Sequence, residues 1–177
     1  MKLQFVYNLA FRTLAFAFFY LVLIFSTTNA DTVDNAQSSS KIEADERVTR
    51  QLDKMENVEG YTVLPFGIVY IKFTLSDGRK QGVFIGHRTG WYHGHEIRNV
   101  WSPALKFKED LPRELSLDLL EQSHNMKWGG WANNGYTIRF VVQISANADK
   151  KSLWAAMLHS VNVADELEEK HTQKDVF

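Results

Sequence analysis

The sequence predicts an α+β fold built on one antiparallel sheet. Apolar and polar residues alternate over two groups of segments, and Asp77-Gly78 and Asn134-Gly135 supply the turns that tight hairpins need. Helical spacing of apolar residues precedes, separates and follows these groups. Strands that come in groups, rather than alternating one by one with helices, favour antiparallel pairing. The predicted order is therefore helix, three strands, helix, two strands, helix.

The composition is that of an ordinary globular protein. With 45% hydrophobic and 23% charged residues, the chain does not resemble a disordered, collagen-like or polytopic membrane protein. Its formal net charge of −1 and its unclustered basic residues argue against nucleic acid as a partner. It contains no cysteine, which excludes disulfides, thiol nucleophiles and cysteine-ligated metals. A length of 177 residues fits a single core.

Residues 1–30 have the pattern of a secretory signal peptide. Lys2 and Arg12 accompany an apolar run over residues 14–25, and small and polar residues follow as far as Ala30. An uncleaved anchor helix is the alternative, but the run is shorter than the about 20 apolar residues that cross a bilayer. We expect cleavage after Ala30, no membrane association afterwards, and a periplasmic or secreted location. The absence of cysteine from an exported domain favours a bacterial periplasm.

The rest of the chain divides into a leader, one domain and a tail. Residues 31–40 are polar and lack periodicity, which predicts a flexible leader. One α+β domain is expected over residues 41–171, and residues 172–177 form a C-terminal tail. The domain opens with a helix over residues 41–58, which Gly60 ends. The thin apolar stripe of this helix consists of Val48, Leu52 and Met55.

Five strands follow from period-two alternation. They cover residues 68–75, 81–87, 96–101, 127–132 and 136–145. Residues 90–94 are expected to connect the second strand to the third, and Pro103 to close the third because proline donates no ladder hydrogen bond. Asn133-Asn134-Gly135, between the last two strands, is the clearest hairpin signal in the chain.

Two further helices complete the fold. One is expected to begin at about Ser116, whose hydroxyl caps it. Its Leu117, Leu120 and His124 fall on one side, and Leu119 and Ser123 flank that side. The other is a long final helix with an Asp149 cap. The core stripe of this final helix consists of Leu153, Met157, Ala164 and Leu167.

The final helix and the aromatic residues suggest surfaces for a partner. Trp154, Leu158 and Val161 widen the apolar stripe beyond what one sheet face usually needs. A deeply docked helix would explain that width equally well. Trp128 and Trp131, like Trp91, Tyr92 and Trp101, lie mid-chain, where aromatic rings near strand ends can form a platform for a sugar, a peptide or a protein. Core filling is the alternative. The candidate partner-binding residues are Trp128, Trp131, Trp154, Leu158 and Val161.

One short histidine cluster could hold a metal. His93 and His95 are separated by one residue, so on an extended segment they point to the same side and could share a divalent ion. His87 or Glu96 would complete the shell. The alternative is an exposed loop whose histidines are solvated and bind no metal. We favour it because such short motifs often match by chance.

Signals of other chemistry are missing from the sequence. No serine lies in a Gly-x-Ser-x-Gly elbow, and Gly129-Gly130 precedes a strand rather than the helix that a phosphate-binding loop requires. We therefore predict no catalytic residue, no cofactor and no enzymatic activity.

Several segments resemble the bacterial YbjN-like family. They are Gly82-Val-Phe-Ile-Gly86, residues 96–104, Leu119-Leu120, Trp128-Gly-Gly-Trp131 and the final helix over residues 153–168. The family is similar in fold to the class I type III secretion chaperones, and the resemblance covers about residues 41–171. It implies a small, usually dimeric and non-enzymatic module that binds protein segments or acts as an accessory factor. Secretion chaperones of this kind are cytosolic, so the export signal does not fit their role.

The expected function is thus an exported binding or accessory module that recognises a protein or peptide partner and forms a homodimer. A metal-binding protein or metal-dependent enzyme that uses His87, His93 and His95 is the alternative. A purely structural envelope protein is a third interpretation, which the sequence neither supports nor excludes.

Overall fold

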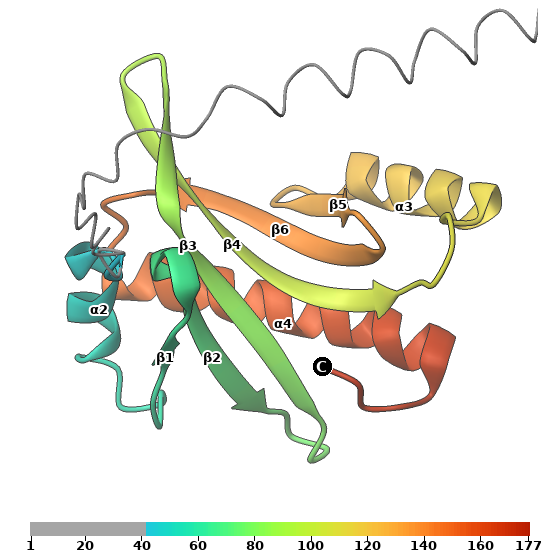
Figure 1. Ribbon diagram of the computed structural model, residues 1–177, viewed down its shortest axis with the longest axis horizontal. Coiled ribbons are helices and arrows are strands. Elements are labelled where there is room, and N and C mark those ends of the chain that lie inside the picture. The colour runs from blue at the N-terminus through green and yellow to red at the C-terminus, as the bar shows by residue number, and fades with distance from the viewer. Residues whose placement is uncertain (1–41) are drawn as a thin grey trace, which may run out of the picture. The chain divides into compact units, whose positions relative to one another are not determined.

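The computed structural model describes residues 42–177. They form an α+β domain with one six-stranded sheet, in which every neighbouring pair of strands is antiparallel (Figure 1). The predicted fold class is therefore confirmed. The signal peptide and leader predicted over residues 1–30 and 31–40 lie outside the described residues.

Two elements that the sequence analysis does not predict, a two-residue strand and a 3₁₀ turn, lie ahead of the longer strands. In chain order the elements are α2 (Glu46–Leu52), β1 (Thr62–Val63), the 3₁₀ turn η1 (Pro65–Gly67), β2 (Val69–Thr74), β3 (Lys80–Tyr92), β4 (His95–Lys106), α3 (Arg113–Asn125), β5 (Gly130–Asn134), β6 (Thr137–Ser145) and α4 (Lys150–Thr172). The strands are arranged in the sheet as β1-β2-β3-β4-β6-β5.

The core lies between α4 and one face of the sheet. Figure 1 shows α4 passing behind β3, and α4 contacts β3, β4, β6 and α2. Asp149 caps α4 as predicted, because its side chain accepts a hydrogen bond from the Ser152 amide at 2.7 Å. The predicted apolar stripes of α2 and α4 are buried: Val48, Leu52, Met55, Leu153, Met157, Ala164 and Leu167. The helix at the start of the domain is shorter than predicted, since it ends at Leu52.

Helix α3 flanks the edge strand β5, and its orientation corrects the prediction. Leu119 is buried, whereas Leu117 and Leu120 are 49% and 65% exposed. The hydroxyl of Ser123, one turn beyond Leu119, accepts a hydrogen bond from the Trp131 amide of β5 at 2.9 Å. The helix thereby covers part of an edge that would otherwise offer unpaired backbone groups.

The start of α3 also differs from the prediction. The helix begins at Arg113, three residues before Ser116, so Ser116 is not its cap. The Ser116 hydroxyl instead donates to the Pro112 carbonyl at 3.0 Å, inside the first turn.

The hairpin of β3 and β4 is longer than predicted. Gly90 belongs to β3, and the turn consists of His93 and Gly94, both with positive φ (46° and 84°). Pro103 does not end β4. Its carbonyl accepts from the Gln81 side chain at 2.6 Å, so its ring nitrogen faces β3 beyond the point where the two strands stop pairing. No ladder bond is lost there, and the proline is accommodated.

The residues after α4 fold back onto the sheet. The Val176 amide donates to Glu168 at 2.7 Å, and the Lys80 amide of β3 donates to Asp175 at 3.1 Å. Glu168 is fully buried and pairs with Arg79 at 3.4 Å, and this burial raises the pKa of its carboxyl. The predicted tail is thus held by specific contacts.

None of the helices in residues 42–177 has the length and hydrophobicity that crossing a bilayer requires.

Candidate binding surface on the open face of the sheet

A row of four large side chains crosses the sheet face opposite α4. Tyr70 pairs in register with Phe84, and Phe84 with Trp101. The ring centroids are 5.0 Å apart in the first pair and 5.7 Å in the second, where the rings stack within 9° of parallel. The guanidinium of Arg139 then lies 5.2 Å from the Trp101 ring centroid. We call this side of the sheet the open face, and these four residues the aromatic row.

Two glycines of β3 make room for the row. Gly82 and Gly86 lie on the open face on either side of Phe84, because side chains alternate along a strand. A Cβ at Gly82 would come within 2.8 Å of the Tyr70 ring, and one at Gly86 within 3.3 Å of the Trp101 ring. The neighbouring rings therefore lie over backbone that carries no side chain.

Two adjoining cavities lie along the open face. The smaller, of about 530 Å³, includes Trp101, Arg139 and the residue Phe66 of η1 in its lining. The larger, of about 680 Å³, extends toward the hairpin tip. Both are lined by Arg88 and Asn99, so they are contiguous. The tip itself, which projects beyond the rest of the sheet in Figure 1, carries two strongly exposed aromatic residues, Trp91 (72%) and Tyr92 (73%).

The smaller cavity is positively charged. Arg88, Arg139 and His87 contribute to its lining, and none of the described residues that line it is acidic. The Nε of Arg139 is buried and has no hydrogen-bond partner in the described part of the chain, and the same is true of the Nδ1 of His87. Burial lowers the pKa of Arg139 because the charged guanidinium is partly removed from water.

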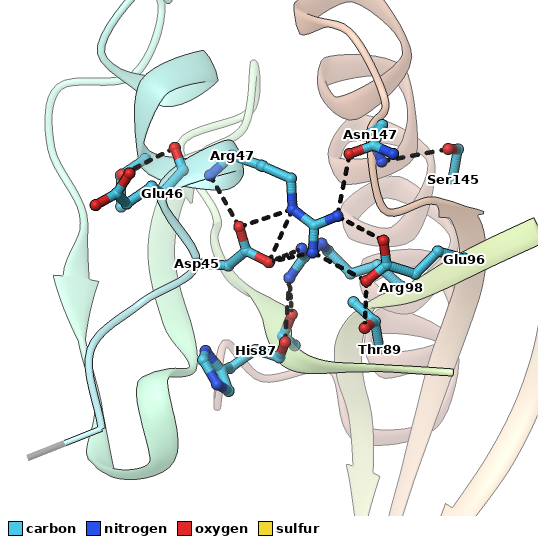
Figure 2. Close-up of polar contacts among 11 residues, drawn as sticks. Asp45, Glu46, Arg47, His87, Thr89, Glu96, Arg98, Ser145 and Asn147 are labelled. Carbon is cyan, nitrogen blue, oxygen red and sulfur yellow. Dashed lines mark hydrogen bonds and ion pairs between the residues drawn. The ribbon is translucent and has the colours of Figure 1, made fainter. Parts of the chain in front are cut away.

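A second group of charged residues lies on the other side of the hairpin (Figure 2). Arg47 of α2 pairs with Asp45 at 2.7 Å and with Glu96 of β4 at 2.6 Å. Arg98, which is almost fully buried, pairs with the same Asp45 and donates to the Gly86 carbonyl. We call Asp45, Arg47, Glu96 and Arg98 the ion cluster. Its ion pairs hold the segment before α2 against the β3–β4 hairpin.

The electrostatics of the ion cluster match its geometry. Hydrogen bonds from Arg47 and Arg98 hold the pKa of Asp45 well below its ordinary value despite partial burial. Hydrogen bonds from Arg47 and Thr89 lower the pKa of Glu96 to about 2. Both carboxylates are therefore ionised at neutral pH, and every guanidinium of the cluster has an anionic partner.

The partner-binding residues predicted from the sequence do not form one exposed surface. Val161 is fully buried in the core. Trp154 is half-buried against Phe73, with ring centroids 5.6 Å apart, and Leu158 is also half-buried. Trp128 is 38% exposed and stacks on His159 of α4, and Trp131 packs against the buried Phe140. Packing thus accounts for much of the apolar width of α4.

The three predicted histidines are not gathered into a metal site. His87 lies in the middle of β3, whereas His93 and His95 lie at the hairpin tip. Among residues 42–177, no group of three or more histidine, aspartate or glutamate side chains is placed to hold a metal ion. Glu96, the other predicted ligand, is bound to Arg47 instead.

The sequence interpretation missed three members of the aromatic row: Tyr70, Phe84 and Arg139. A signal for them exists in the alternation Gly82-Val-Phe-Ile-Gly86. Glycine on both sides of an aromatic residue, at the positions that share its face, indicates that rings from neighbouring strands approach the backbone there.

A scan against protein-family models gives no match for this chain, and a search of the curated proteins gives none either.

Proposed function

We propose that this protein is an exported, non-enzymatic module that binds an extended polypeptide segment across its open face. The observation that carries the proposal is the aromatic row, which crosses four neighbouring strands beside two contiguous cavities. Clustered aromatic and arginine side chains are the usual anchors of protein interfaces.

The shape of the surface favours an extended chain over a compact ligand. An extended peptide places alternate side chains on the same side, and adjoining pockets can accept them in turn. Two cavities of about 530 and 680 Å³ that share Arg88 and Asn99 provide such a sequence of pockets. The exposed Trp91 and Tyr92 at the hairpin tip would extend the contact beyond the sheet.

The resemblance to the YbjN-like family supports the same function, because its chaperone-like relatives bind polypeptide against sheet and helix surfaces. The signal-like N-terminus supports a periplasmic or secreted location for this activity. The homodimer predicted from the sequence stays a prediction, which light scattering of the purified protein would test. Such a dimer would use the half-buried Trp154 and Leu158 and would not use the fully buried Val161.

Peptide-array binding tests the proposed function. The purified protein is incubated with immobilised twelve-residue peptides that cover diverse sequences, and the positive peptides are then titrated in solution. We expect Trp101→Ala and Phe84→Ala to weaken binding at least about tenfold, as for central anchor residues. Leu120→Ala is the control, because Leu120 is 65% exposed on α3 and lines neither cavity. Equal binding by Trp101→Ala and the unmodified protein would contradict the proposal.

A further inference from the structure

Arg139 differs from every other arginine that is at least half-buried. Arg47, Arg79 and Arg98 each form a close ion pair with one or more carboxylates. Arg139 forms none with any residue in the range 42–177, and its buried Nε has no partner there. Removing a cation from water is unfavourable unless an anion or a set of acceptors compensates. Within residues 42–177, the Arg139 side chain has no ion pair, and its guanidinium lies over the Trp101 ring.

The surroundings of Arg139 increase the positive charge instead of balancing it. Arg88 lines the same cavity, and so does His87. Figure 2 shows the imidazole of His87 turned away from the ion cluster, while its carbonyl faces Arg98. The cavity thus combines an aromatic wall, two guanidinium groups and an imidazole, without an acid among its described lining residues.

We propose that this cavity binds a carboxylate of the polypeptide ligand and that Arg139 receives it. The inference rests on the proposed function, because the carboxylate belongs to a peptide that lies on the open face. A guanidinium presents two parallel N–H groups that match the two oxygens of a carboxylate. The occupant is therefore an acidic peptide, with a glutamate or aspartate side chain, or its own C-terminal carboxylate, placed beside the aromatic row.

Trp101 positions the arginine for this role. A contact with an aromatic face restrains the guanidinium while its N–H groups stay available for hydrogen bonds. Phe66 lies at the cavity with 64% of its surface exposed and with a positive φ of 64°, a conformation that is uncommon for a residue with a side chain. Its ring is thus placed to contact an apolar neighbour of the bound carboxylate.

Two matched peptides test the proposal. The probes are acetyl-Leu-Val-Glu-Val-Leu-amide and the same peptide with glutamine in place of glutamate. Each is titrated into ¹⁵N-labelled protein while the Nε–H signal of Arg139 and the indole N–H signal of Trp101 are followed by NMR. We expect the glutamate peptide to shift both signals and to bind roughly tenfold more tightly than the glutamine peptide, the ratio typical of one charge-assisted hydrogen bond.

Variants separate charge from geometry. Arg139→Gln should remove the preference for glutamate, and Arg139→Lys should restore part of it, because lysine keeps the charge but not the planar fork. Arg113→Gln is the control, since Arg113 is exposed at the start of α3. Preserved folding of each variant is verified from the dispersion of its amide spectrum.

The outcomes distinguish the two proposals. Equal affinity for both peptides, with shifts confined to the open face, would overturn the carboxylate site and leave the polypeptide-binding surface intact. Shifts confined to other surfaces would contradict both. A glutamate preference that survives in Arg139→Gln would show that another cation receives the carboxylate, and so would overturn the assignment.

Discussion

Two arginines on opposite faces of the sheet, Arg98 of β4 and Arg139 of β6, differ in their partners. On the core side, Arg98 is almost fully buried, and it pairs with Asp45 and donates to the Gly86 carbonyl. On the open face, Arg139 of β6 is half-buried, lies over the Trp101 ring and has no partner for its Nε in the described chain. Both guanidiniums are partly or fully removed from water, but only that of Arg98 has a carboxylate and backbone carbonyls as acceptors.

This difference distinguishes Arg98, whose charge is paired within the fold, from Arg139, whose guanidinium stays available to a ligand. A buried charge that the fold itself needs is paired, because an unpaired one lowers stability. A charge left partly desolvated beside a cavity is available to an external anion. The ion cluster therefore holds the hairpin to the segment before α2, whereas the aromatic row is a surface that four strands form on the open face.

The largest expected effect is on the ion cluster. Asp45→Ala would leave the buried Arg98 without its carboxylate and remove one partner of Arg47. We expect the free energy of unfolding to fall by about 3 to 5 kcal/mol, the range for breaking a buried pair from one side. Glu46→Ala is the control, because Glu46 is exposed and pairs loosely with Arg50 at 3.7 Å. A loss below about 1 kcal/mol in Asp45→Ala, measured by urea unfolding, would show that the cluster contributes little to stability.

The same cluster should make the protein sensitive to acid. The pKa of Asp45 is far below its ordinary value in the folded state, and that of Glu96 is lowered to about 2. Carboxyls with depressed folded pKa values stabilise the protein fully above their unfolded pKa values, and this contribution disappears as the pH falls through the folded values. We expect the free energy of unfolding to decrease between about pH 5 and pH 2, and Glu96→Gln to make this decrease shallower across the range. An unchanged curve in Glu96→Gln would contradict this assignment.

Substitutions at two glycines of β3, Gly82 and Gly90, test the packing of the open face, with a smaller expected effect on stability. An alanine Cβ at Gly82 would lie 2.8 Å from the Tyr70 ring, whereas one at Gly90 would have no heavy atom within 4 Å. We expect Gly82→Ala to destabilise the protein by about 1 to 2 kcal/mol through displacement of the ring. Gly90→Ala should be neutral or stabilising by up to about 1 kcal/mol, because alanine restricts the unfolded chain. Thermal unfolding of both variants measures the change in stability. Equal losses of stability would mean that Gly82 is not required to leave space for the Tyr70 ring.

The smallest expected effect is the coupling between Trp101 and Arg139. A double-mutant cycle with Trp101→Ala and Arg139→Ala should give a coupling energy of about 0.5 to 1 kcal/mol in unfolding, as for a cation–π pair near a surface. A cycle between Arg139 and the distant Trp154 provides the control. Coupling near zero in the first cycle would indicate that the ring does not hold the guanidinium.

The sequence predicted much of the fold because the decisive signals are local. The Asn-Gly hairpin, the Asp149 cap and the buried stripe of α4 all follow from neighbouring residues. The predicted orientation of α3 is wrong because the real one depends on packing against the edge strand β5, which helical periodicity does not indicate. The prediction that Pro103 ends its strand is wrong for a similar reason. Its nitrogen faces β3 where β3 and β4 no longer pair, and the sequence does not show where that pairing stops.

The candidate surface was harder to predict than the fold. Tyr70, Phe84, Trp101 and Arg139 come from four strands, and only the register between those strands brings them together. The aromatic residues that the sequence suggests as a platform lie in three different places: against the core, at the hairpin tip and on the open face. Whether an arginine has a carboxylate partner depends on tertiary contacts, which neither composition nor spacing reveals.

The different roles of the two arginines are tested by the free energies of unfolding of Arg98→Gln and Arg139→Gln, measured under the same conditions in the absence of ligand. We expect Arg98→Gln to lose about 3 kcal/mol or more, because it breaks a buried ion pair, and Arg139→Gln to lose no more than about 1 kcal/mol, because its guanidinium has no carboxylate partner in the described chain. Equal, large losses in both variants would make Arg139 a structural residue rather than a binding residue.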